Sequence, residues 1–144
     1  MNDPILVKID AIHAGTLARL TPNSSGRWGA CQFVADPKLK SCDYWVVLNY
    51  LTSAETARCP KENTIFVALE PPSVHLFNDG YAQQFGAVIT CQDQLKHPNL
   101  VLQNQGYIWF TELSYDAHVA MGPIVKERLI SVISSNKTMT PGHR

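Results

Sequence analysis

The chain has 144 residues, which fits a single globular domain of ordinary size. Hydrophobic residues make up 45% and charged residues 17% of the sequence, and this composition excludes a disordered chain. The 12 basic and 12 acidic side chains cancel, so the sequence lacks the cationic excess that nucleic-acid binders and membrane-surface proteins need. No apolar run approaches the roughly 18 residues of a membrane span, and the N-terminus does not resemble a secretory signal. We therefore expect a cytoplasmic protein with no nucleic-acid partner and no membrane span.

Short apolar runs separated by polar connections predict β-strands along most of the chain. Ile5–Ile9 alternates in polarity, whereas Tyr44–Leu48 and Thr64–Leu69 are continuous apolar runs, typical of strands buried on both faces. Further strands are expected at Ala87–Thr90, Leu100–Leu102 and Leu129–Ile133, and helices or turns at Ser53–Arg58, Asp79–Phe85 and Ala117–Arg128. Buried strands that alternate with helices indicate the α/β class, with a mainly parallel sheet.

The end of the sequence suggests a second domain. The expected strand Leu129–Ile133 is followed only by a polar stretch, residues 134–144. A strand and a polar loop normally lead into another element, so we expect residues 1–128 to form one domain and residues 129–144 to begin a truncated second one. An incomplete edge of this kind would expose apolar surface and favour self-association. The alternative is a frayed C-terminal tail.

Several kinds of site are disfavoured by spacing. The cysteines (Cys31, Cys42, Cys59 and Cys91) lie far apart in sequence with no CxxC pair, which predicts reduced thiols rather than disulfides. The histidines form no HxH or HExxH pair, so no metal site is expected. The sequence also lacks the glycine-rich phosphate loops and the GxSxG elbow, which disfavours P-loop proteins, dinucleotide binders and serine hydrolases.

Glu70 is the sharpest candidate for a catalytic residue. It follows the apolar run Thr64–Leu69 and precedes Pro71 and Pro72, which extend and stiffen the backbone. Ligands of open α/β sheets bind outside the carboxyl ends of the strands, where this carboxylate would lie. With an apolar wall behind it, Glu70 could serve as a general base. A solvated carboxylate in a turn, or a cap for the next segment, explains the same position.

Three tryptophans and one histidine remain as binding candidates. Trp45 lies inside an expected strand and belongs to the core. Trp28 and Trp109 lie near loops, where an indole can stack on a sugar ring or simply pack. His97 lies in the loop before Leu100 and suits either a surface position or a ligand contact.

Three stretches together resemble the N-terminal half of a fucosyltransferase-type glycosyltransferase of family ten, in its bacterial branch. They are the strand Asp43–Leu48 after Cys42, the segment Leu69-Glu-Pro-Pro-Ser73, and residues 129–137 with 140–144. Residues 27–33 and 85–94 fit the same pattern, so that the resemblance spans most of residues 27–144.

The resemblance implies a GT-B enzyme with two facing Rossmann-like domains. This chain would be the acceptor-side domain, and a second domain would hold a nucleotide sugar of the GDP-fucose type. The reaction would be inverting, with Glu70 as catalytic base and with no cofactor or metal. Asn136, Lys137 and Arg144 would contact the donor, whereas Trp28, His97 and Trp109 are expected to contact the glycan acceptor. The alternatives are a non-catalytic carbohydrate-binding or assembly module, and a small Rossmann-like protein in which Glu70 is structural.

Overall fold

A computed structural model describes residues 3–11, 14–51, 53–104, 111–130, 132 and 136 of the chain. Among these residues the strands are β1 (Ile5–Asp10), β2 (Arg27–Trp28), β3 (Cys31–Val34), β4 (Tyr44–Leu48), β5 (Thr64–Ala68), β6 (Ala87–Thr90) and β7 (Leu100–Leu102). The helical elements are the 3₁₀ helices η1 (Ala14–Leu20), η2 (Pro22–Ser24) and η3 (Lys61–Asn63) and the short α-helices α1 (Asp79–Ala82) and α2 (Tyr115–Ala120).

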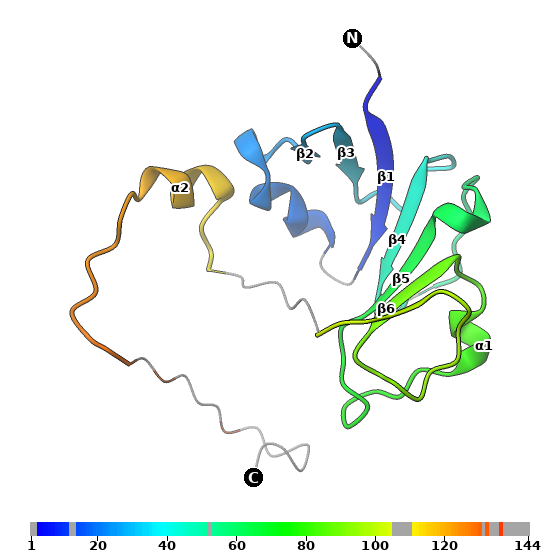
Figure 1. Cartoon of the computed structure of the whole chain (residues 1–144). Coiled ribbons are helices and arrows are strands. Elements are labelled where there is room, and N and C mark those ends of the chain that lie inside the picture. Colours follow the sequence, from blue (N-terminus) through cyan, green and yellow to red (C-terminus); the bar gives the residue numbers. More distant parts are fainter. Residues whose placement is uncertain are drawn as a thin grey trace.

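The strands form one sheet in the order β2-β3-β1-β4-β5-β6-β7 (Figure 1). Every neighbouring pair is parallel except β2 with β3. Later strands are therefore added on both sides of β1, as in doubly wound α/β sheets. The chain changes direction across the sheet between β1 and β4, which makes their carboxyl ends the topological switch point. The mainly parallel α/β sheet expected from the sequence is confirmed.

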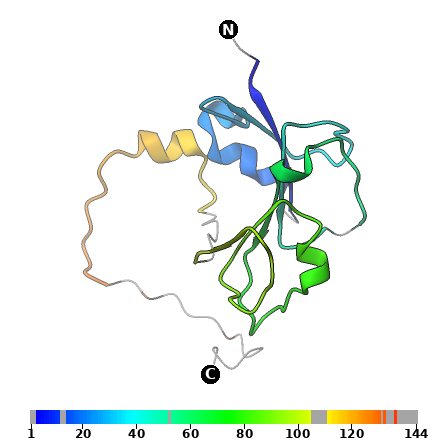
Figure 2. The same cartoon turned by 45° about the vertical axis from the view of Figure 1, so that its right-hand side comes forward.

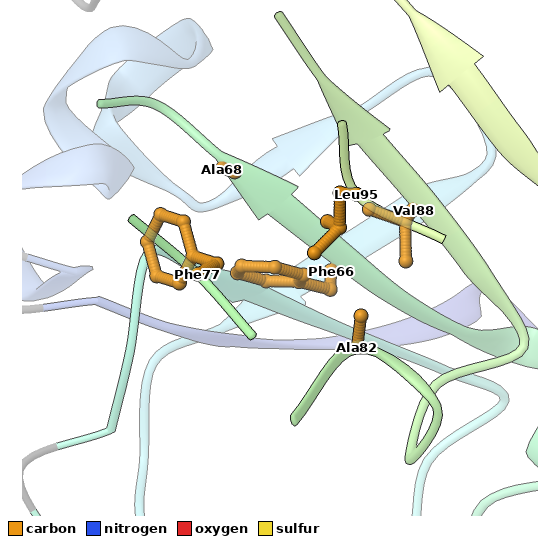
Figure 3. Close-up of a cluster of buried hydrophobic side chains, with 6 residues drawn as sticks. All are labelled: Phe66, Ala68, Phe77, Ala82, Val88 and Leu95. Carbon is orange, nitrogen blue, oxygen red and sulfur yellow. The ribbon is translucent and has the colours of Figure 1, made fainter. Parts of the chain in front are cut away.

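The two faces of the sheet are covered unequally. On one face Phe66 of β5 is fully buried and forms the centre of a cluster with Phe77, Ala82, Val88 and Leu95 (Figure 3). Its ring stands edge-on to Phe77, with centroids 4.9 Å apart. The opposite face of β4 and β5 is only partly buried, so the expectation that both strands are buried on both faces was wrong.

The short helical elements explain this difference in coverage. Figure 2 shows η1 (blue) and α1 (green) on opposite sides of the sheet. η1 covers the face near β1 and β3, where Ala14 is buried, and leaves the β4–β6 part of that face without a helix among the described residues. A parallel sheet normally carries long crossover helices on both faces, and here the described crossovers are short helices and loops.

Several expected elements differ from the structure. The helix expected over Ser53–Arg58 does not form; Arg58 instead makes a parallel bridge with Ser41. The helix expected to reach Arg128 ends with Met121 as its C-cap, because Gly122 adopts the left-handed backbone (φ +65°) that commonly stops a helix.

The strand expected at the end of the chain has no counterpart in the described residues of that range. Leu129, Ile130 and Val132 belong to no strand and are almost fully exposed. A strand needs a partner for its backbone hydrogen bonds, and no described strand adjoins these residues. The boundary expected at residue 128 stays a prediction.

Candidate active site

Glu70 lies where the carboxyl edge of the sheet was expected to place it. β5 ends at Ala68, and Glu70 follows two residues later, partly buried, at the start of the loop that leads to α1. Pro71 then begins a turn in which its carbonyl oxygen accepts hydrogen bonds from the backbone N–H groups of Val74 (2.9 Å) and His75 (3.1 Å). The loop is therefore compact from Pro71 onward, whereas the two prolines were expected to extend the backbone.

A buried glutamine fastens this loop to the next strand. Gln92 follows β6 and is fully buried. Its side-chain Nε2 donates to the carbonyl oxygens of Glu70 (2.9 Å) and His75 (2.7 Å), and its Oε1 accepts from the backbone N–H of Phe77 (3.3 Å). One side chain thus fixes both ends of the loop. Gln92 was not predicted from the sequence, where its one signal is a polar side chain shortly after an apolar strand.

An asparagine holds the neighbouring loop in a similar way. Asn49 follows β4 with a left-handed backbone (φ +63°), a conformation that asparagine tolerates better than most residues. Its Oδ1 accepts from the backbone N–H of Leu69 (2.7 Å), and its own N–H donates to the carbonyl of Val67 (2.9 Å). The carboxyl ends of β4 and β5 are therefore tied together just before Tyr50 and Glu70.

An open pocket of about 280 Å³ lies at this edge of the sheet. Its wall combines residues after β4, in the Glu70–Phe77 loop and in α1: Tyr50, His75, Leu76, Phe77, Asn78 and Tyr81. The His75 ring lies 4.4 Å from the Phe77 ring and 5.7 Å from the Tyr50 ring, measured between centroids. Aromatic faces and a few polar atoms at the carboxyl edge are typical of a small-ligand site.

Tyr81 lines the pocket, but its hydroxyl is buried. The hydroxyl is shielded from solvent and lies near the backbone of Leu51. Burial raises the pKa of Tyr81 above its ordinary value, and the nearby Leu51 backbone offsets part of that rise. The hydroxyl therefore stays protonated at neutral pH and is not exposed to the pocket, so that the polar side chains lining it are those of Tyr50, His75 and Asn78.

A second polar cluster lies on β1 and β4. Lys8 is fully buried, and its Nζ lies 2.6 Å from both Asp10 Oδ2 and Glu55 Oε2. Burial lowers the pKa of Lys8, but the two carboxylates outweigh it and raise the pKa above the usual 10.5. Trp45 completes the cluster: its Nε1 donates to Asp10 Oδ2, and its ring lies 4.7 Å from Lys8 Nζ.

The cluster is fully paired within the chain, which favours a structural role for Lys8. A protonated lysine with two carboxylate partners is neither a nucleophile nor a base. The burial of Lys8 was not predicted from the sequence, because a lysine inside a short strand usually reaches solvent. Glu55 comes from the segment for which a helix was expected, and its contact with Lys8 explains why local helix propensity does not prevail there.

The other predicted site residues are not gathered around Glu70. His97 lies in the loop before β7, at the amino-terminal edge of the sheet; its Nε2 donates to the carbonyl of Phe85 (3.1 Å) and its Nδ1 accepts from the N–H of Asn99 (3.0 Å). Both ring nitrogens are thus used within the chain. Trp28 lies on β2, at the far edge of the sheet, where it is 51% exposed and contacts Tyr115 edge-on.

The remaining predicted residues cannot be placed relative to the pocket. Asn136 is exposed, whereas Trp109, Lys137 and Arg144 lie outside the described residues.

The described part of the chain holds no group of three or more His, Cys, Asp or Glu side chains suited to a metal ion. No helix formed by the described residues is long and apolar enough to cross a membrane. No family model, curated protein or solved structure matches this chain.

Proposed function

We propose that this chain is the acceptor-side domain of an inverting, fucosyltransferase-like glycosyltransferase. One observation carries the proposal: Glu70, at the carboxyl end of β5, opens the loop that forms a wall of the aromatic pocket. The resemblance of the sequence to family ten supplies the reaction class. In this proposal the domain is one half of a GT-B enzyme, and the second domain holds a nucleotide sugar of the GDP-fucose type.

The pocket suits a sugar ring for a chemical reason. Sugars present patches of C–H groups that pack on aromatic faces, and hydroxyls that need hydrogen-bond partners. Tyr50, His75 and Phe77 offer the aromatic surface, and His75 and Asn78 carry polar side chains in the pocket wall. We place the acceptor here rather than against Trp28 or His97, which lie at other edges of the sheet.

In the proposed mechanism Glu70 acts as general base. An acceptor hydroxyl is a poor nucleophile at neutral pH, and a carboxylate within hydrogen-bond reach accepts its proton as the new glycosidic bond forms. The sugar hydroxyl attacks the anomeric carbon opposite the nucleotide, which leaves with its bonding electrons, so the configuration inverts. The gain from such a base is about 10²–10⁴ in rate.

Glycan-array binding by this chain tests the pocket. We expect Tyr50→Ala and His75→Ala to weaken binding of the preferred glycan by at least about tenfold, a loss typical of one stacking contact. Trp28→Ala, an exposed aromatic outside the pocket, serves as the matched control and should leave binding unchanged. Loss of binding in Trp28→Ala alone would place the acceptor on β2 and contradict the proposed pocket.

A transfer assay with GDP-fucose tests the base, using the protein that contains this chain together with any domain that follows it. Glu70→Gln should lower kcat by at least about a hundredfold while glycan binding stays within about twofold. Normal turnover in Glu70→Gln would refute the catalytic role. Glycan binding without transfer from any nucleotide sugar would favour the second candidate, a non-catalytic carbohydrate-binding module, which the same aromatic pocket supports.

A further inference from the structure

Cys42 and Cys59, which are far apart in sequence, are neighbours in the fold. Ser41 and Arg58 form a parallel β-bridge. The backbone N–H of Arg58 donates to the carbonyl of Lys40 (2.8 Å), and the N–H of Cys42 donates to the carbonyl of Arg58 (3.0 Å). This is the hydrogen-bond pattern of parallel strands, and it places the next residue on each side, Cys42 and Cys59, opposite one another.

This pairing brings the two thiols within bonding range. Side chains opposite each other on parallel strands point to the same face, and their Cα atoms are about 4.8 Å apart. A disulfide spans Cα separations of roughly 4.4–6.8 Å, so the backbone already has the required spacing. The two thiols are close enough to influence each other's charge, and neither forms a disulfide.

We propose that Cys42 and Cys59 are a redox-active dithiol that a small-molecule disulfide, such as oxidised glutathione, converts into an intramolecular disulfide. Cys59 is the more accessible thiol, because it is partly exposed whereas Cys42 is buried. The Cys59 thiolate attacks the small disulfide, forms a mixed disulfide and releases one thiol. Cys42 then attacks the Cys59 sulfur and displaces the second thiol. Two protons and two electrons leave the protein, and the reagent is reduced to two thiols.

The surroundings of Cys59 set the pace of the reaction. Its S–H donates to the carbonyl of Asp43 (3.7 Å), and the Asp43 and Glu62 carboxylates lie nearby. Burial, together with the adjacent Cys42 thiol, raises the pKa of Cys59 to about 11. The thiol is then almost entirely protonated at neutral pH, and only the thiolate reacts. We therefore expect oxidation of the pair to be slow at neutral pH and faster as the pH rises.

The disulfide would close a ring over residues 42–59, which contains β4 and Glu55. Closing such a ring restricts the unfolded chain more than the folded one. The ring also encloses the segment that carries Glu55 to Lys8, so oxidation would hold this crossover in place. The inference does not depend on the proposed sugar transfer, because it concerns the amino ends of β4 and β5, away from the pocket.

The test is a comparison of the protein equilibrated with oxidised and with reduced glutathione. Free thiols are blocked with N-ethylmaleimide, and the protein is digested without reduction and mapped by mass spectrometry. We expect one linked peptide pair, Cys42 with Cys59, and a melting midpoint higher by roughly 5–10 °C that a reductant reverses. Cys59→Ser should abolish the shift, whereas Cys31→Ser and Cys91→Ser, which keep the pair, should retain it.

Two results would overturn the proposal: a stable glutathione adduct on Cys59 without the link, or linked peptides that involve Cys31 or Cys91. Cys42→Ala is the second variant of the pair. Because Cys42 is buried, this variant could fold poorly. The peptide map of the unaltered chain then decides the question alone, since it requires no substitution.

Discussion

Replacing Lys8 by methionine should destabilise the fold severely. Methionine matches the length of the lysine stem, so the change removes the charge and leaves little cavity. It breaks two contacts of 2.6 Å and leaves the Asp10 and Glu55 carboxylates, whose side chains are only 8% and 16% exposed, facing each other without a cation. Removing one partner from a buried charge pair costs about 3–5 kcal/mol.

This cost is a large part of the total free energy of unfolding. A chain of this length is stabilised by roughly 7–20 kcal/mol at about 0.05–0.15 kcal/mol per residue. Urea denaturation followed by circular dichroism measures the loss directly. With a slope of about 1–3 kcal/mol/M, a loss of about 3–5 kcal/mol in Lys8→Met should lower the urea midpoint by roughly 1–5 M. Lys40→Met, at an exposed lysine, is the matched control and should change stability by no more than about 0.5 kcal/mol.

A second variant separates the charge from the packing. When Lys8→Met is combined with Glu55→Gln, only one carboxylate is left without a cation, so the double variant should be more stable than Lys8→Met alone. A loss below about 1 kcal/mol in Lys8→Met would refute the reasoning. It would mean that the carboxylates reach water or other partners when Lys8 is removed.

Three further predictions concern other parts of the fold. Gln92→Leu should lower the free energy of unfolding, measured by urea denaturation, by about 2–4 kcal/mol, because the Glu70 and His75 carbonyls lose their hydrogen-bond donor. Hydrogen exchange in the pocket loop should become faster, and unchanged exchange would contradict this role. Gly86→Ala should lower the melting midpoint by at least about 5 °C, because an added Cβ would overlap the backbone carbonyl oxygen of Lys61. A variant as stable as the parent would refute this contact. The free energy of unfolding should fall as the pH rises from 9 towards 11, because the pKa of Cys59 is raised from 9.0 to about 11 in the folded protein and the unfolded chain loses this proton first. Cys59→Ser should flatten this part of the pH profile, and an equal slope in both proteins would disprove the assignment.

The sequence predicts the positions of most strands correctly, but it predicts poorly the elements that connect them and the burial of their faces. The apolar runs that become β4, β5, β6 and β7 are found within a residue of their expected bounds, because hydrophobic pattern alone determines them. The strands β2 and β3 were missed because they have only two and four residues, too few to show a clear strand pattern. The expected Ser53–Arg58 helix failed because its conformation depends on Lys8, a contact over a distance that local propensity does not include.

The position of a site residue can likewise be predicted where it depends on neighbouring residues in the sequence, but not where it depends on tertiary contacts. The position of Glu70 follows from local rules, since a buried strand and two prolines confine it to the lip of the sheet. The expected position of His97 near the acceptor depends on tertiary contacts, and the structure places this histidine at the amino-terminal edge of the sheet. Gln92 and the pair Cys42 and Cys59 could not be found from spacing, because their roles arise only when neighbouring strands are in register.

The carboxyl edge of the sheet is held by neutral groups, and this matters for the proposed chemistry. Asn49 and Gln92 fix the loops after β4 and β5 through amide hydrogen bonds, which neither titrate nor weaken with salt as surface ion pairs do. The charged cluster of Lys8 lies on the sheet itself, where both carboxylates are already paired with it. A base at Glu70 would therefore be carried by a loop whose backbone is fixed by hydrogen bonds that do not titrate. If amide hydrogen bonds set the pocket, ligand affinity should depend on the aromatic wall and change little with ionic strength.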